Sequence, residues 1–448
     1  MAAGDGEPEP AVQRPQLQSK NVCVWLYDPT TARGLVPSTS SAYDACLRLR
    51  TPREAMGFSD FQFLPRDGAG RDPRRFPGHR EVHCYLPDFC AAFGLMDAVR
   101  LNTRVVRVAP TSTTTRQRQW AVRSVRRLGG PEDGARVEEE EEEVVFDAVV
   151  VATGQYSHPM LPSGIEGVGE WRRRQLHSRL YRTPEPFRGE AVVVVGCGDS
   201  GTDIALDLRR VAREVHLAAS SEAATPAVSR MVANHGDVLR LHPRVRRLHA
   251  DGRVSFADGS SVVADTVFFC TGYGYSFPFL DTGGAVAVGD GGCVVAPLFE
   301  ASSTCSRREV GRAGAVRPPR AAAGGGDAAG RGGALPRQGG RRRAEEAHPP
   351  RHHHIGGIDK MIEFMEEYGD LTPMEDWKEE LLLSSMASMC DDLETFRDRA
   401  DDSENVRQGL QGWRGGVDAQ AQHMTMAAAA EAEADGQAMA KKETPQLN

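Results

Sequence analysis

One stretch of the chain has the residue types and the glycine spacing of a phosphate-binding turn. It reads AVVVVGCGDSGTDIALDL and runs from Ala191 to Leu208. In this pattern Gly196 allows a tight turn after a strand, Gly198 lets the backbone approach a pyrophosphate, and Gly201 permits close packing of helix on strand. The start of the following helix would supply free N–H groups and a partial positive charge. The stretch therefore predicts a dinucleotide site rather than a purely structural turn.

The choice of nucleotide depends on the end of the next strand, about 20 residues after the last glycine, where a carboxylate would hold the ribose of NAD. The chain reads HLAASSEAA there. Ser220 and Ser221 can hydrogen-bond a 2′-phosphate, whereas Glu222 leaves NAD open as an alternative. The pattern favours NADP, with Ser200 of the glycine loop near the phosphates through its hydroxyl or its backbone N–H.

The elements around the loop predict a compact α/β unit over residues 187–263. The unit contains the strand and helix of the loop, a second strand REVHLAAS and a short hairpin GRVSFADGSSVV. On either side, Val144–Gly154 and Val262–Leu280 each predict an apolar strand that ends in a small-residue turn. This arrangement indicates a nucleotide-binding domain inserted into a larger sheet domain.

Composition divides the rest of the chain into segments. Cys305–Pro350 contains no aromatic residue and cannot build a core. The expected organisation is a disordered leader (1–20), the first part of the larger domain (21–186), the inserted domain (187–263), a return segment (264–304), a low-complexity disordered segment (305–354), a C-terminal helical part (355–412) and a disordered tail (413–448).

Local periodicity predicts several further elements. Alternation with period two predicts antiparallel strands in LNTRVVRVAPT and QWAVRSVRR, continued by RVEEEEEEVVFDAVVVATG, with Glu138–Glu143 as a solvated hairpin edge. Helical spacing predicts helices in Tyr85–Leu95, in IDKMIEFMEEYGD and in WKEELLLSSMASMCDDLETFRDR. A short strand is expected over Asn21–Pro29.

Composition also excludes several classes of partner. The net charge of −8 argues against nonspecific nucleic-acid binding, and no run approaches the apolar length of a membrane span. The nine cysteines are scattered, without a CxxC pair or zinc-ligand spacing, which favours reduced thiols in the cytoplasm. The adjacent histidines His352–His354 converge poorly, so we expect no metal site.

Several stretches taken together resemble the flavin-containing monooxygenases, most closely their plant S-oxygenase branch. They cover roughly Trp25–Glu300 and Gly356–Gly412, and they read WLYDP, TPREAMGFSDFQFLP, DPRRFPGHREV, FDAVVVATGQYSHPMLP, HSRLYRTPEPFRGEAVVVVGCGDSGTDIALDL, ADTVFFCTGYGYSFPFLD and MCDDLETFRDR. The resemblance implies an α/β flavoprotein fold with two dinucleotide-binding domains, in which a Rossmann-like NADP-binding domain is inserted in a larger FAD domain.

The resemblance also implies an activity and its cofactors. NADPH would reduce FAD, the reduced flavin would take up O2 as a C4a-hydroperoxide, and retained NADP+ would shield that intermediate from water. A soft nitrogen or sulfur nucleophile of a small molecule would then take the distal oxygen. Because the protein mainly positions cofactors and excludes solvent, no side-chain catalytic pair stands out and no catalytic residue is assigned.

Candidate cofactor-contacting residues follow from the same resemblance. Those expected to face the flavin or the cleft between domains are Trp25, Arg53, Glu54, His79, Thr153 and Tyr156. The family fingerprint appears as WRRRQLHSRLY, with Trp171, His177 and Tyr181 in place and Arg173 at a glycine position. His177 is either a cofactor contact or a satisfied, partly buried histidine. If the family's glycine has a positive φ, arginine would add strain of about 1 kcal/mol or more.

Three departures from the family pattern bear on the flavin. The family's GGTW-like segment already appears at Val22–Trp25, which implies that the first βαβ unit and its FAD pyrophosphate loop are missing. Arg50 stands where the family usually has asparagine, and Cys305–Pro350 replaces an apolar stretch. The larger domain is therefore expected to be incomplete. A catalytically inactive NADP-binding remnant or a regulatory paralogue is the alternative function.

Overall fold

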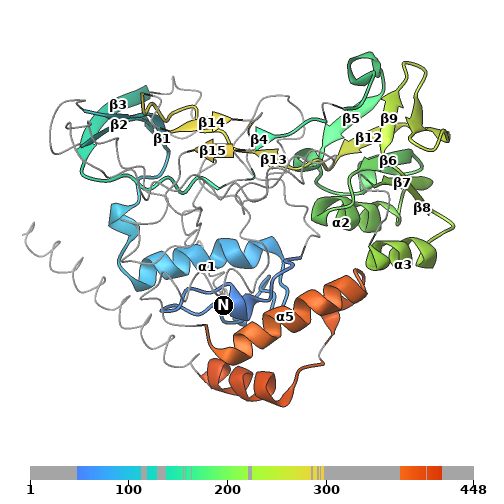
Figure 1. Ribbon diagram of the computed structural model, residues 1–448. Coiled ribbons are helices and arrows are strands. Elements are labelled where there is room, and N and C mark those ends of the chain that lie inside the picture. Colours follow the sequence, from blue (N-terminus) through green and yellow to red (C-terminus); the bar gives the residue numbers. More distant parts are fainter. Residues whose placement is uncertain are drawn as a thin grey trace, which may run out of the picture.

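The computed structural model describes twelve parts of the chain. They are residues 48–111, 119–128, 138–154, 156, 158–162, 164–219, 225–283, 286–289, 292, 294–296, 374–399 and 401–415. Trp25, Ser220, Ser221 and Glu222 lie outside these parts, as do the predicted leader, the predicted strand over 21–29 and the low-complexity segment. Figure 1 shows the strands in a row along the top of the molecule, with α1 and α5 beneath them.

A five-stranded parallel sheet forms the right-hand part of Figure 1. Its order is β5 (Arg174–His177), β12 (Thr266–Phe269), β6 (Ala191–Val195), β7 (Glu214–Ala218) and β8 (Leu239–His242). All five residues of β6 are buried, because this strand has neighbours at both edges and covered faces. β5 and β12 lie outside residues 187–263, so the sheet takes strands from beyond the predicted limits of the inserted domain.

Both faces of this sheet are covered. Val192 and Val194 of β6 pack with Leu208 of α2 (Asp199–Leu208) and Met231 of α3 (Pro226–Asn234). Val193 packs on the other side, against a small antiparallel sheet with the order β11 (Ser261–Val263), β10 (Arg253–Phe256) and β9 (Val245–Leu248). This sheet confirms the predicted hairpin, and α2 and β7 confirm the predicted helix and second strand.

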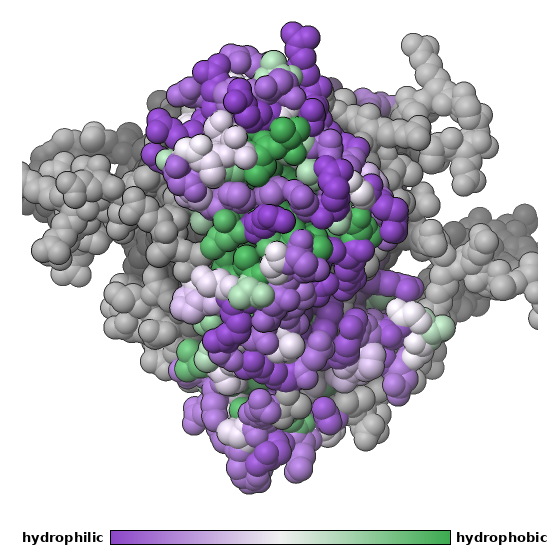
Figure 2. Space-filling view, turned by 90° about the vertical axis from the view of Figure 1, so that its right-hand side faces the viewer, coloured by the Kyte–Doolittle hydropathy of each residue, from purple (hydrophilic) through white to green (hydrophobic). Residues whose placement is uncertain are grey.

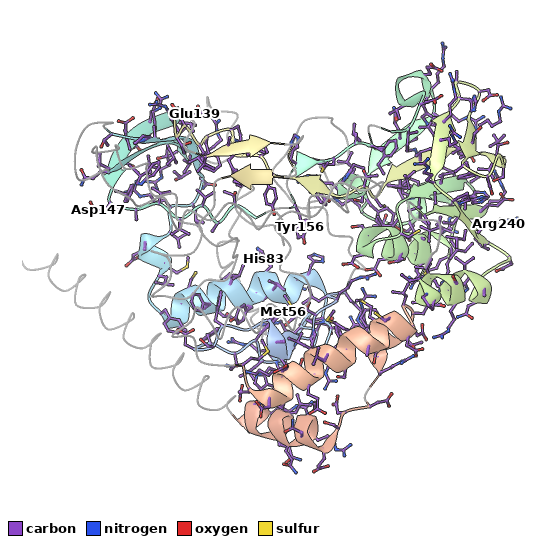
Figure 3. All side chains as sticks on the ribbon, viewed as in Figure 1. Met56, His83, Glu139, Asp147, Tyr156 and Arg240 are labelled. Carbon is purple, nitrogen blue, oxygen red and sulfur yellow. The ribbon has the colours of Figure 1, made fainter. Side chains whose placement is uncertain are left out.

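β8 is the edge strand of the parallel sheet. Its Arg240 is exposed and points away from the molecule at the right of Figure 3. The face on this side, seen in Figure 2, is mainly hydrophilic, with separate apolar patches near its middle. An exposed charge on an edge strand opposes pairing with another chain.

A three-stranded antiparallel sheet lies at the other end of the row. Its order is β1 (Thr103–Pro110), β2 (Trp120–Leu128) and β3 (Glu138–Phe146), which confirms the three predicted strands. The glutamates of β3 are at the edge, as predicted, and Glu141 and Glu142 pair with Arg123 and Arg100. These ion pairs and the remaining charge keep the edge solvated.

The predicted apolar strand over Val144–Gly154 is wrong beyond Phe146. β3 ends there, and residues 147–154 carry no strand assignment. Val150 and Val151 are 55% and 37% exposed. An apolar run becomes a strand only where neighbours satisfy its backbone groups, and among the described residues none pairs with 147–154.

Two short antiparallel pairs lie between the larger sheets (Figure 1). β4 (His158–Pro159) pairs with β13 (Tyr273–Gly274), and β14 (Ala287–Gly289) pairs with β15 (Val294–Ala296). Single-turn 3-10 helices occur at Arg53–Ala55, Met96–Ala98, Val168–Glu170, Ser178–Leu180, Glu185–Phe187 and Phe396–Asp398.

The helical layer beneath the strands joins distant parts of the sequence. α1 (His79–Ala92) confirms the predicted helix but begins before Tyr85, and it buries an aromatic cluster that includes Phe61 and Phe63. α5 (Asp376–Asp391) confirms the helix predicted in the C-terminal part, which ends at Asp391 rather than continuing through FRDR. Within the described ranges, no helix combines the length and apolar character that a membrane span requires.

A further helix over residues 404–415 corrects the predicted start of the tail at 413. Its Trp413 is 8% exposed and donates its ring N–H to Gln62 Oε1 at 3.0 Å. Trp413 packs in one cluster with Leu64, Trp377, Leu381, Val406 and Leu410. Trp413 is therefore part of a packed cluster within the helix.

Candidate functional site

The glycine loop between β6 and α2 has no room for side chains at two positions. Gly196 has a φ of +108°, and a Cβ there would lie 2.5 Å from the carbonyl oxygen of Cys270. A Cβ on Gly201 would lie 1.8 Å from the carbonyl oxygen of Gly196. The first turn of α2 therefore packs directly on the backbone that leaves β6.

Gly198 differs from these two glycines because its surroundings are open. It is the N-cap of α2, and a Cβ there would meet nothing within 4 Å. Ser200 is also exposed. The first N–H groups of a helix have no partner inside that helix, and its start carries partial positive charge. The loop thus combines open space with the donors that a pyrophosphate needs.

Three parallel strands bring their carboxyl ends to one edge beside this loop. Val195 of β6 is in register with Phe269 of β12, which is in register with His177 of β5. The sheet therefore places His177 at the same edge as Gly196, as a nucleotide site at the strand ends would require. Arg53, Glu54 and His79 belong to a separate segment around α1.

His177 is held by the backbone through both ring nitrogens. Its Nδ1 accepts from the Arg179 N–H at 3.1 Å, so its Nε2 carries the proton and donates to Gly272 O at 3.0 Å. Burial lowers the pKa of His177 to about 4, so the ring is neutral at physiological pH. These contacts fit the satisfied, buried alternative predicted for this residue.

The neutral ring of His177 predicts a stability that depends on pH. Burial lowers its pKa from 6.5 to about 4, so between these values the unfolded chain binds a proton that the folded chain excludes. The free energy of unfolding is therefore undiminished by this residue above pH 6.5 and decreases as the pH falls toward 4. Replacing His177 by asparagine should reduce this loss by up to about 3 kcal/mol.

The measurement is urea unfolding of the wild type and His177→Asn at about pH 7.5 and about pH 4.5. Desolvation also lowers the pKa values of His79, His83, His216 and His242, but these residues are present in both proteins and their effects cancel in the comparison. An equal loss of stability in the two proteins would contradict the neutral, buried state of His177.

The expected strain at Arg173 does not occur. Among the described non-glycine residues only Asn102 has a positive φ. The Arg173 guanidinium donates to Ala264 O at 2.7 Å and to Asp251 O at 3.1 Å, across the turn at Gly252. Arginine is accommodated at this position because its φ is not positive and because its side chain hydrogen-bonds to the backbone at the end of a hairpin.

Arg53 and Glu54 form a buried polar group beside α1. Arg53 is 1% exposed, donates to Asp72 O at 2.7 Å, and lies 4.7 Å from the Phe63 ring centroid. Its Nε and Nη1, together with Glu54 Oε2, have no hydrogen-bond partner among the described residues. Burial raises the pKa of Glu54, although the arginines beside it act in the opposite direction. Buried polar atoms of this kind fit a site for a polar ligand.

Thr153 and Tyr156 are exposed and lie near the connection between the two large sheets. The Tyr156 ring is 5.6 Å from that of Tyr273, which is 5.0 Å from that of His177. In Figure 3 Tyr156 points down toward α1, and His83 of α1 points up toward the strands. Tyr156 is therefore linked to the strand-end edge, whereas no contact joins Thr153 to the other predicted residues within the described set.

Arg50, which the sequence places in the flavin region, instead binds to α2. Its guanidinium contacts Asp203 Oδ1 at 2.9 Å, Asp199 Oδ1 at 2.7 Å and Thr202 Oγ1 at 2.8 Å. Arg397, from the C-terminal part, donates to Asp203 Oδ2 at 2.8 Å. Sequence reasoning missed this cluster because its members are about 150 or more positions apart.

A second polar cluster that the sequence did not predict lies in β7 and β8. His216 Nδ1 is 3.0 Å from His242 Nε2, and His216 Nε2 is 3.1 Å from Glu214 Oε2. The His242 ring stacks on Phe256 at 4.1 Å. Since Ala219 N donates to His242 O, this cluster fixes the end of β7 that precedes the predicted 2′-phosphate residues.

The parallel sheet, its glycine loop and the separate buried segment around α1 define the class as flavoproteins with two dinucleotide-binding regions. Residues 37–237 match the family described as flavin-binding monooxygenase-like. The flavin-containing monooxygenase FMO GS-OX-like 9 of Arabidopsis thaliana is 40% identical over 86% of this chain and 87% of that protein. FMO GS-OX-like 8 of the same plant is 38% identical over 86% of each chain.

Solved structures agree with this similarity. The S-allyl-L-cysteine S-oxygenase from Allium sativum superposes with a TM-score of 0.65 at 28% identity, over 88% of this chain and 91% of that chain. Tmm from Pelagibacter sp. strain HTCC7211 has the same fold, with a TM-score of 0.55 at 17% identity over 87% of each chain. The chain therefore belongs to the flavin-binding monooxygenase-like family. It is an oxidoreductase of a family that uses FAD and NADPH.

Proposed function

We propose that this chain oxygenates the sulfur or nitrogen atom of a small, soft nucleophile, with NADPH as reductant and O2 as the source of oxygen. The observation that carries the proposal is the similarity to the S-allyl-L-cysteine S-oxygenase, which extends over 88% of this chain. That similarity favours sulfur over nitrogen as the atom that is oxygenated.

The proposed reductant site is the glycine loop at the start of α2. Gly198 and Ser200 would contact the NADP pyrophosphate, because their surroundings are open and the first N–H groups of α2 point out of the helix. Gly196 and Gly201 would keep the loop close to β6 and so hold these donors in place. Ser220, two positions after the last residue of β7 in the sequence, would bind the 2′-phosphate.

The proposed flavin site includes Trp25, Thr153, Arg53 and Glu54. The unpartnered Arg53 N–H groups and Glu54 Oε2 are suited to the polar atoms of FAD, which supplies redox and oxygen chemistry when bound. The protein's own part is to orient the cofactors and exclude water from the reacting atoms. His177 would contribute by holding the Gly272 backbone at the strand ends while remaining neutral.

The test uses the purified full-length chain. Its flavin absorbance is recorded, and NADPH is then added aerobically with an S-alkyl cysteine or a tertiary amine. The expected result is bound flavin, NADPH oxidation and formation of the S-oxide by mass spectrometry. Reactions under nitrogen, and reactions with catalase, control for oxygen dependence and for free peroxide. NADP binding by a colourless protein without product would overturn the proposal in favour of the non-enzymatic alternative.

We also propose that the protein is cytoplasmic. The proposal is supported by the five cysteines in the described part of the chain, which are all free thiols. Fluorescent tagging and cell fractionation would test it, and recovery in an oxidising compartment would contradict it.

A further inference from the structure

We propose that Arg50 is a positioning residue of the dinucleotide site, which neutralises Asp199 at the start of α2. The inference rests on the proposed binding of NADP at this helix. It assigns part of the NADP site to a residue far outside the glycine loop.

Asp199 raises an electrostatic problem for the proposed site. It is the first residue of α2, within the loop GCGDSG, and its side chain is 78% exposed. A carboxylate at a helix start is favourable for the helix itself. The same carboxylate repels the negatively charged pyrophosphate that would bind at that start. An unpaired Asp199 would therefore weaken binding of the dinucleotide.

Arg50 provides the opposite charge directly at this carboxylate. Its Nη1 lies 2.7 Å from Asp199 Oδ1, and its Nη2 donates to Asp199 O at 3.2 Å. Arg50 thus contacts both the side chain and the backbone of the residue that follows Gly198. A charge-assisted contact of this length offsets most of the local negative charge.

Arg50 is fixed in this position by a second, buried carboxylate. Its Nε and Nη2 lie 3.1 Å and 2.9 Å from the two oxygens of Asp203, a bidentate arrangement that leaves Nη1 directed at Asp199. The side chains of Arg50 and Asp203 are only 16% and 10% exposed. Burial acts to raise the pKa of Asp203, but Arg50 and Arg397 lower it below its usual value, so this carboxylate stays charged.

The consequence is that affinity for NADP depends on the segment that carries Arg50. Arg50 lies 149 positions before Asp199 in the chain, so the two residues meet only because the folded chain brings their segments together. Any shift of that segment relative to α2 would expose the Asp199 carboxylate to the bound phosphates. The affinity for NADP therefore depends, through Arg50, on how the segment that carries this residue is placed against α2.

The experiment measures NADP+ binding by isothermal titration calorimetry for the wild type, Arg50→Gln, Asp199→Asn and the double variant. We expect Arg50→Gln to bind about tenfold more weakly and the double variant to regain most of that loss. Asp199→Asn alone should bind within about threefold of the wild type, because its charge is already neutralised. Arg50→Lys keeps the charge and should bind nearly as well as the wild type.

Arg48→Gln is the matched control. Arg48 pairs with Asp398 at 2.6 Å and donates to Arg397 O at 3.0 Å, and among the described residues no ion pair joins it to α2, so its replacement should leave NADP+ affinity unchanged. Unchanged affinity in Arg50→Gln, or an equally weak double variant, would overturn the inference. If Arg50→Gln does not fold, tighter binding by Asp199→Asn of about tenfold would also overturn it, whereas near-equal binding supports it. Absence of NADP+ binding in the wild type would instead refute the proposed function.

Discussion

Gly201→Ala should lower the free energy of unfolding by about 3 kcal/mol and abolish NADP+ binding. The added Cβ would lie 1.8 Å from Gly196 O, and that contact is with backbone rather than with a side chain that could turn away. α2 cannot move outward to relieve it, because Ile204 and Leu208 anchor the helix in the core beneath the sheet. The free energy of unfolding is measured by urea denaturation followed by circular dichroism.

Gly198→Ala is the matched control for this prediction. Its Cβ would meet nothing within 4 Å and the φ of −75° suits alanine, so stability should fall by less than about 1 kcal/mol, the cost of alanine at an N-cap. NADP+ binding should still weaken, because the methyl group occupies the space proposed for the pyrophosphate. Wild-type stability in Gly201→Ala would show that α2 does not pack on the Gly196 backbone as described.

Asp203→Asn should lower the free energy of unfolding by about 3 kcal/mol. The substitution keeps the shape of the side chain but removes the negative charge between Arg50 and Arg397, whose side chains are 16% and 12% exposed. Two poorly solvated guanidinium groups would then lie close together, with the exposed Asp199 carboxylate beside Arg50 as their remaining negative partner. The loss should be visible as a lower midpoint of urea denaturation.

Asp398→Asn is the comparison for the Asp203 variant. Asp398 pairs with Arg48 at 2.6 Å, but its side chain is 64% exposed, so this surface pair should contribute less than about 1 kcal/mol. Similar losses in the two variants would mean that burial does not strengthen the Asp203 cluster, contrary to the prediction.

Short-range patterns explain what could be predicted from the sequence. The glycine spacing predicted the turn and the close approach at Gly201, because Gly201 packs on Gly196, a near neighbour in the chain. Alternation with period two gave β1 and β2, because successive side chains of a strand point to opposite faces, and β3 continues the same sheet at its exposed edge. Apolar spacing gave α1 and α5 for the corresponding reason in helices.

Long-range pairing explains what could not be predicted. Val150 and Val151 have the composition of a buried strand, but that outcome depends on partners that the local sequence does not specify. β12 pairs with both β6 and β5, although β5 begins about 17 residues before β6 and β12 begins about 75 residues after it. The cluster of Arg50 with Asp203 could not be predicted either, because no periodic pattern relates two charges so far apart in the chain.

The pairing of β4 with β13 has a mechanical consequence for the whole molecule. The chain passes from the antiparallel sheet to the parallel sheet near His158 and returns near Tyr273, and these two passages are hydrogen-bonded to each other. The parallel sheet therefore cannot move away from the antiparallel sheet at this point without breaking the backbone hydrogen bonds that join the two passages. The ion pairs of Asp203 with Arg50 and Arg397 add a second connection, because they join α2 of the parallel-sheet part to two segments of the helical layer.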